Sequence, residues 1–357
     1  MPDLKTSMKP FLVLVILAVG ARALVMGSSL VAAKLDMARY SQLHDGREYQ
    51  QIAHAIVSPD QLRSLGDETQ RLFPGYPAVV RLAMLVTPAP WAAVGVNVLA
   101  AVAAVLLFWR LTGDLWLAAY FAVFTPSWLL FSSNAMSEGL FLALALAGVA
   151  LWSAGRPNAA SFILGLVTLV RPVGALVFAA CFIAGLRRPN KTQAVWWAAL
   201  FLFAPLVWIG IAWAIWGDPF RQIHAYAAKD LGVPLKAVIS QTLASDVSLL
   251  KKALVWFTLV TNLLAIGWLF RAFLEKRDES NLIWLLWSVF HAVFYLAIPS
   301  TWAFGSLDRF FVTALPPMMA GLRPLLPNRW WCVAVLAAAG VAVCVRWNVH
   351  LVGASFF

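Results

Sequence analysis

The residues best suited to chemistry lie in one polar segment, residues 41–77, between a first apolar stretch and a long series of others. Acids, bases and histidines crowd together there as nowhere else in the chain: His44, Asp45, Arg47, Glu48, His54, Asp60, Arg63, Asp67, Glu68 and Arg71. A carboxylate that is partly desolvated near a membrane surface can act as a general base toward an incoming hydroxyl. Asp45 is the residue for which we predict this role.

A short interfacial helix is predicted from Asp45 to about Val57. His44 and Glu48 are four residues apart, as are Asp45 and Tyr49, so each pair shares one helix face. A solvated amphipathic helix with local charge pairs is the alternative interpretation of this pattern. Because the spacing of the histidines and acids matches no standard metal motif, we predict no cofactor and keep a divalent metal as the alternative.

Further charged residues lie at the edges of apolar segments. Arg71 begins the proline-bracketed turn RLFPGYP, where it either marks a helix start or presents a planar donor fork to a phosphate. Glu138 and Arg171 interrupt apolar segments, where a charge costs on the order of 2.5–3.5 kcal/mol at the helix centre. They are therefore candidates for function, or else an ion pair that only fastens two helices. Asp308 and Arg309 lie at another span end, as site residues or as interface anchors.

A second polar segment, GDPFRQIHAYAAKD, contributes His224 and Lys229. A substrate that carries a phosphate would need several cations on one face of the membrane. Four basic residues are predicted on that face: Arg71, Arg171, Lys229 and Arg309.

Composition indicates a membrane protein. The chain of 357 residues is 62% hydrophobic and 12% charged, with a mean hydropathy of +0.80. Soluble proteins are roughly 45–50% apolar and about 25% charged. The net charge of +11 comes mostly from bases in short segments at span ends, as membrane topology requires. The sequence contains no basic stripe with interleaved aromatic residues, so it does not predict nucleic acid binding.

Apolar segments recur from Phe11 to the C-terminus, so we predict one all-α transmembrane domain, residues 1–357, with about 10 to 12 helices. Bases before the first, uncleaved helix place the N-terminus in the cytoplasm and two polar loops, residues 34–76 and 217–252, on the outer face. Residues 75–88 are too short for a comfortable span and predict a half-inserted or strongly tilted helix. The other predicted spans include 114–132, 138–153, 193–216 and 309–322.

Several short motifs follow one another along most of the chain. They are DG followed by Y and IA, then LFPGYP with a nearby arginine, TPSWLLFSSNAMSEGLF, GLVTLVRPVGAL, GDPF and a final span with DRF. This ordered series resembles bacterial relatives of the PIG-V type mannosyltransferases, which belong to the GT-C class of membrane glycosyltransferases. Two positions depart from the pattern. The aromatic residue common before the first-loop aspartate is His44 here, and the one before the tyrosine is Glu48.

The resemblance implies a GT-C-like helical bundle that transfers a sugar such as mannose, with inversion, from a polyprenyl-phosphate donor to an acceptor hydroxyl. It implies an active site at the outer face of the bacterial inner membrane, with Asp45 as the base. The expected partners are the lipid donor, the bilayer and a glycan, lipid or protein acceptor. Two alternatives stay open, namely a transporter or flippase of lipid-linked sugars and a non-catalytic subunit of an envelope-assembly complex. The expected substrate-binding residues are Glu48, Tyr49, Arg71, Glu138, Arg171, His224 and Arg309.

Overall fold

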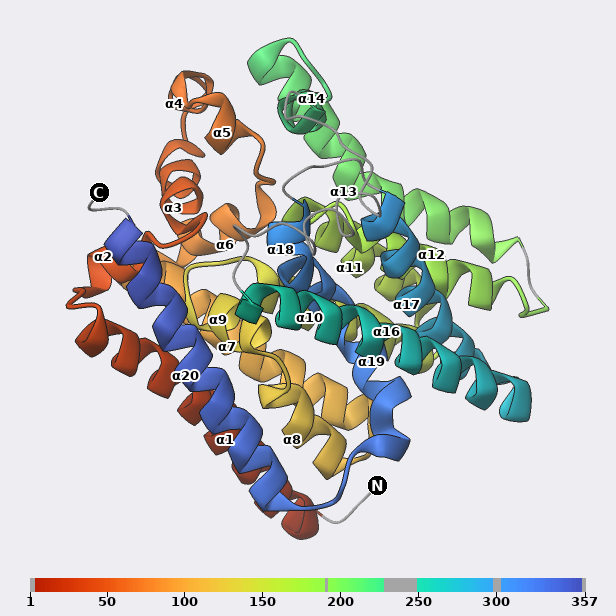
Figure 1. The fold of residues 1–357 in the computed structure, drawn as a ribbon. Coiled ribbons are helices and arrows are strands. Elements are labelled where there is room, and N and C mark those ends of the chain that lie inside the picture. The colour runs from red at the N-terminus through yellow and green to blue at the C-terminus, as the bar shows by residue number, and fades with distance from the viewer. Residues whose placement is uncertain (1–3, 190–191, 228–248, 298–302, 355–357) are drawn as a thin grey trace.

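The computed structural model describes residues 4–189, 192–227, 249–297 and 303–354 (Figure 1). Throughout these ranges every regular element is a helix and no strand occurs. This confirms the predicted all-α fold.

Long apolar helices form the body of the molecule. Six are long and apolar enough to cross a membrane by length and composition. They are α1 (Leu4–Ala32), α7 (Ala89–Thr112), α13 (Gln193–Trp216), α16 (Leu249–Lys276), α17 (Glu279–Ala297) and α20 (Trp330–Ala354).

Shorter apolar helices complete the bundle. One is a bent pair, α8 (Leu115–Val123) and α9 (Pro126–Ser133), whose axes differ by 72°. The others are α10 (Glu138–Ser153), α11 (Pro157–Val170) and α12 (Gly174–Gly185). With the bent pair counted as one span, the described ranges contain up to seven candidate membrane spans, fewer than the 10 to 12 predicted, because α10, α11 and α12 are shorter than the roughly 17–25 residues of a full span. The protein is thus a multi-pass membrane protein.

The bend between α8 and α9 is explained by Pro126, which has no N–H to donate to the carbonyl of Ala122. The guanidinium of Arg22 on α1 donates to that carbonyl instead, at 3.3 Å, and also to Ala18 at 3.0 Å. The same guanidinium lies 4.8 Å from the ring centroid of Trp128 on α9. Arg22 therefore holds the broken helix against α1 although its side chain is almost fully buried.

The predicted span over residues 309–322 is interrupted. The chain forms α18 (Ala303–Phe310), a 3-10 turn η1 (Phe311–Ala314) and α19 (Leu315–Leu322), followed by η2 (Arg323–Leu325). Pro316 and Pro317 remove two N–H donors of a continuous helix, which leaves preceding carbonyls without their usual partners. The carbonyl of Thr313 accepts from the indole of Trp287 instead, at 3.1 Å.

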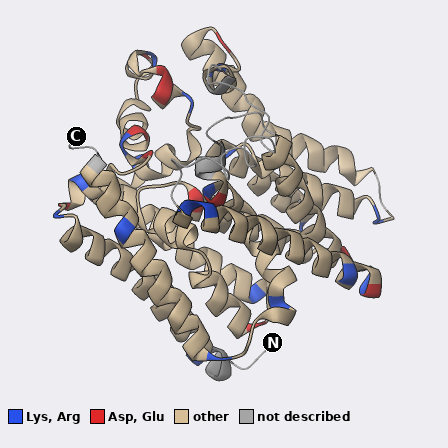
Figure 2. Ribbon diagram, in the orientation of Figure 1, with Lys and Arg blue, Asp and Glu red and all other residues tan. Residues whose placement is uncertain are grey.

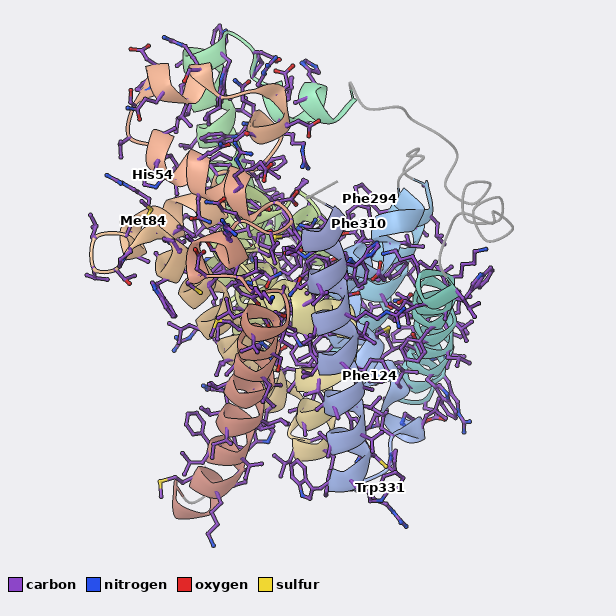
Figure 3. The ribbon with its side chains drawn as sticks, turned by 60° about the vertical axis from the view of Figure 1, so that its left-hand side comes forward. His54, Met84, Phe124, Phe294, Phe310 and Trp331 are labelled. Atoms are coloured by element: carbon purple, nitrogen blue, oxygen red, sulfur yellow. The ribbon has the colours of Figure 1, made fainter. Side chains whose placement is uncertain are left out.

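Short helices project from one end of the bundle. In Figure 3, where His54 is labelled in one of these helices, they lie toward the end of the molecule opposite Trp331. The helix predicted to begin at Asp45 is present and starts at Gly46. The helix predicted over residues 75–88 is shorter than expected and ends at Ala83. The projecting helices are α2 (Met37–Ser41), α3 (Gly46–Ala55), α4 (Pro59–Ser64), α5 (Asp67–Gln70), α6 (Gly75–Ala83) and α14 (Arg221–Ala227).

The two polar segments of the sequence contact each other at this end. Arg63 on α4 donates to the last carbonyls of α13, at Ala214 and Ile215, where helix carbonyls lack intrahelical partners. Arg221 on α14 donates to Gln70 at 2.6 Å and pairs with Asp67, so α14 is fixed to α5. These contacts join the first loop to the segment that follows α13.

Candidate active site

Five charged side chains from separate parts of the chain contact one another. In Figure 2, red and blue segments of the ribbon lie close together near the middle of the molecule. Asp45 accepts from Arg71 at 3.1 Å through Oδ1 and from Arg309 at 2.8 Å through Oδ2. Glu138 Oε1 lies 2.6 Å from Nε of Arg309 and 3.0 Å from Nη1 of Arg171. The carboxylates and arginines therefore form one connected charge cluster.

Each member of the cluster except Arg309 lies at a helix boundary. Asp45 precedes α3, Arg71 follows α5, and Glu138 is the first residue of α10, where the helix dipole favours a negative charge. Arg171 follows α11 with φ −150° and ψ 131°, because Pro172 excludes the helical conformation from the preceding residue. Helix ends thus direct charged side chains from the loops and the bundle toward one point.

Asn97 on α7 holds the turn that delivers Glu138. Its amide donates to the carbonyls of Phe131 at 2.6 Å and Asn134 at 2.8 Å, and its oxygen accepts from the N–H of Gly139 at 2.8 Å. Sequence reasoning did not single out this residue. An asparagine inside the apolar run AAVGVNVLAAV was the signal, since buried amides in membrane helices need specific partners.

Helix α18 is anchored by the residue before Arg309. The Asp308 carboxylate accepts from Ser127 on α9 and from Lys251 on α16, the latter at 2.9 Å, and its side chain is only 3% exposed. The Arg309 guanidinium lies 4.8 Å from the ring centroid of Phe131. Asp308 is therefore a buried packing residue, and sequence reasoning missed its partners on α9 and α16.

A cleft of about 80 Å³ opens beside the charge cluster. Glu138 is fully buried beneath it, whereas the other four charged side chains are 12–17% exposed. The cleft combines three cations with a single exposed carboxylate. Its lining residues are Asp45, Tyr49, Arg71, Leu72, Phe73, Val170, Arg171, Pro172, Arg309 and Phe310.

Electrostatics keep the Asp45 carboxylate charged. Burial alone would raise its pKa, but the charges of Arg309 and Arg71 outweigh burial and hold the pKa below its usual range. A carboxylate in this state is a poor proton acceptor while both guanidiniums contact it. Loosening of at least one contact is needed before Asp45 can act as a base.

The other predicted site residues have different surroundings. Tyr49 lines the cleft, its hydroxyl lies 2.9 Å from that of Ser137, and burial raises its pKa. Glu48 does not line the cleft, and one of its carboxylate oxygens is buried without a hydrogen-bond partner among the described residues.

His224 lies on α14 and is not among the residues that line the cleft. It is 61% exposed and pairs with Asp218 at 2.8 Å. Lys229 lies outside the described residues.

His44 adopts a left-handed backbone conformation, φ 58°, next to Asp45. Its ring packs edge-on against Phe131, with centroids 5.0 Å apart. Burial, with the nearby Arg309 charge, lowers its pKa to about 4, while Asp45 and Glu138 act in the opposite direction. The imidazole is therefore neutral at neutral pH.

A pH-dependent stability follows from His44. Unfolding would restore its pKa to 6.5, so the unfolded chain binds the proton first as pH falls, and stability decreases between about pH 6.5 and 4. His44→Asn, which tolerates the left-handed conformation, removes this term. The difference in Tm between pH 7 and pH 5 should be smaller in the variant than in the wild type. An equal difference in the two proteins would contradict this account of His44.

Metal-binding groups of three or more histidine, cysteine or acidic side chains do not occur in the described ranges. Asp45 and Glu138 are instead connected through arginine.

Comparisons with known proteins support the fold. No protein-family model and no curated protein matches the chain. The apo crystal structure of the Archaeoglobus fulgidus oligosaccharyltransferase superposes with a TM-score of 0.52 at 12% identity, over 96% of this chain and 55% of that one. The same enzyme tethered to an acceptor peptide gives 0.41 at 13% identity, over 93% and 54%. The chain thus spans about half the length of this enzyme. At such identity the likeness concerns the fold, which is GT-C-like as predicted.

Proposed function

We propose that the protein is a GT-C glycosyltransferase. It transfers a sugar, with mannose as the first candidate, from a polyprenyl-phosphate donor to an acceptor hydroxyl at the outer face of a bacterial inner membrane. The observation that carries this proposal is the cleft in which one carboxylate, Asp45, lies among three arginines. A base and an anion-binding surface are the two groups that this reaction requires.

The reaction assigned to Asp45 is removal of the acceptor proton. The acceptor oxygen forms a bond to the anomeric carbon on the face opposite the phosphate, so the configuration inverts. The bond between that carbon and the phosphate oxygen breaks, and its electron pair leaves with the phosphate. Because this leaving group is anionic, Arg71 and Arg171 stabilise it by charge, and no proton donor is needed.

Donor binding also explains how Asp45 becomes a base. A phosphate entering the cleft competes with Asp45 for the Arg71 guanidinium, which is 3.1 Å from Oδ1 before binding. Loss of that contact raises the pKa of Asp45 toward the value of an ordinary carboxylate. The donor should therefore bind before proton transfer from the acceptor.

A second cavity, of about 230 Å³, suits the lipid part of the donor. It shares Phe73 and Pro172 with the charged cleft, so the two are adjacent. Its walls are almost entirely apolar, and an isoprenoid chain would bury hydrocarbon there. The remaining lining residues are Thr168, Leu169, Ala175, Phe201, Leu202, Pro205, Trp208, Ile209, Pro219, Phe220, Gln222 and Ile223.

The proposed function is tested with purified protein in lipid vesicles. Transfer of radiolabelled mannose from a long-chain polyprenyl phosphate to a cell-envelope extract is measured, and a short-chain donor is compared. Leu202→Trp, which fills the apolar cavity, should raise KM for the long-chain donor about tenfold, equivalent to roughly two fewer buried methylene groups.

Leu206→Trp is the matched control, since Leu206 lies on the same helix, is exposed and does not line the cavity. Equal effects of the two substitutions would remove the apolar cavity from the proposal. Movement of the lipid-linked sugar across the vesicle membrane without any transfer would favour the transporter alternative.

A further inference from the structure

We propose that Arg309 is a built-in cation that takes the place of a divalent metal ion between two acidic side chains of the site. Its guanidinium aligns Asp45 with Glu138 and makes the cleft independent of metal. The activity part of this inference rests on the proposed function, whereas the metal-binding part can be tested without it.

The geometry of Arg309 is that of a bridge. Nε and Nη2 are neighbouring donors on one edge of the planar guanidinium, and they contact Glu138 at 2.6 Å and Asp45 at 2.8 Å. The two carboxylates come from α10 and from the start of α3, 93 positions apart in the sequence. Two carboxylates close enough to contact the same guanidinium repel each other unless a cation lies between them. Carboxylate oxygens around a central cation are also the arrangement that a divalent ion such as Mn²⁺ or Mg²⁺ prefers.

Contacts outside the cleft fix the position of Arg309. Asp308, the preceding residue, is fixed by Ser127 and Lys251, and the Arg309 guanidinium packs on the ring of Phe131. With 14% of its side chain exposed, Arg309 is positioned by contacts from α9 and α16. A lysine at this place would carry the charge on a single nitrogen and could not present two parallel donors.

The other two arginines of the cluster have a different role. Arg71 pairs with Asp45 and with the exposed Glu68, and Arg171 pairs with Glu138. Either can move toward a phosphate without separating the two carboxylates from each other. The three arginines therefore divide into Arg309, a positioning residue for Asp45, and two anion-binding residues.

Removal of Arg309 should expose a latent metal site. Without the guanidinium, Asp45 would keep only Arg71 and Glu138 only Arg171 as an ion-pair partner, and no cation would lie between the two carboxylates. Glu138 has one further buried oxygen, Oε2, that accepts no hydrogen bond within the described ranges and is available as a ligand. A divalent cation is the simplest group that restores the lost charge.

The experiment measures Mn²⁺ binding by electron paramagnetic resonance and Tm with and without Mn²⁺, on purified full-length protein. The wild type should bind Mn²⁺ weakly and keep its transfer activity after treatment with EDTA. Arg309→Ala should bind Mn²⁺ about tenfold more tightly than the wild type and gain Tm in its presence. Arg309→Met, which keeps the length of the side chain, is the second variant in case the alanine variant is poorly folded.

Arg71→Ala is the matched control, because it also removes a cation from Asp45 but leaves the bridge intact, so no new Mn²⁺ site should form. Adding Asp45→Asn to Arg309→Ala should abolish the new binding. The inference is overturned if wild-type activity requires a divalent ion, or if neither Arg309 variant binds or is stabilised by Mn²⁺. Absence of transfer activity in the wild type would overturn the proposed function instead, and leave the binding result to decide the role of Arg309.

Discussion

Asp45→Asn is expected to lower the rate of sugar transfer by about 10²–10⁴-fold, the usual contribution of a general base. The amide has nearly the same shape as the carboxylate but cannot take up the acceptor proton. Arg71 and Arg309 contact different carboxylate oxygens in the wild type, so the single amide oxygen keeps the hydrogen bond to one of them and the amide NH2 faces the other. The measurement is kcat for transfer from a polyprenyl-phosphate sugar, together with Tm in detergent.

Asp60→Asn provides a control for this substitution in the same loop. Asp60 pairs with Arg63 at 3.0 Å, but its side chain is 89% exposed and lies outside the charged cleft. The same chemical change there should leave kcat unchanged. Full activity of Asp45→Asn, or an equal loss in both variants, would remove Asp45 from its role as the base.

Glu138→Ala is expected to produce the largest loss of stability, about 3–5 kcal/mol of unfolding free energy. Its carboxylate is fully buried and contacts both Arg171 and Arg309. Alanine would leave the two arginines with one fewer counter-charge in a region of low dielectric. Unfolding can be followed by denaturant titration in mixed micelles.

Glu275→Ala is the matched comparison, since it removes a glutamate from an ion pair with Arg271 at 2.9 Å in which both side chains are more than half exposed. An exposed pair of this kind contributes little, because water and salt screen it. Glu138→Gln should fall between the two, as it keeps a hydrogen-bond acceptor but loses the charge. If Glu138→Ala and Glu275→Ala had the same stability, the buried cluster would not contribute to folding.

Much of the fold could be predicted from local patterns in the sequence. The predicted spans at 138–153 and 193–216 coincide with α10 and α13, because each is a long apolar run bounded by polar or glycine residues. The interruption of the span at 309–322 was not predicted, although Pro316 and Pro317 lie within it. Prolines are tolerated inside membrane helices when neighbours satisfy the freed carbonyls. Such neighbours, here Trp287, are a property of the packing.

The candidate site was predicted in part for the same reason. Asp45, Arg71, Glu138, Arg171 and Arg309 could be selected because each charge in an apolar or membrane-edge setting needs a partner. Which charge meets which is decided by helix packing, and no local pattern contains it. His224 was selected on the same grounds, yet it pairs with its neighbour Asp218 away from the cleft.

The contacts between α5 and α14 connect the charged cleft with the apolar cavity. Arg221 fixes α14 to Asp67 and Gln70 on α5, and the residue that follows α5 is Arg71, which lines the charged cleft. Phe220 and Ile223, at the same α14 segment, line the apolar cavity. Under the proposed function, α5 and α14 together would contact both the head group and the tail of the donor. A tail too short to reach α14 would then also leave Arg71 less firmly positioned. Chain length would then be sensed in the rate of the chemical step as well as in the strength of binding.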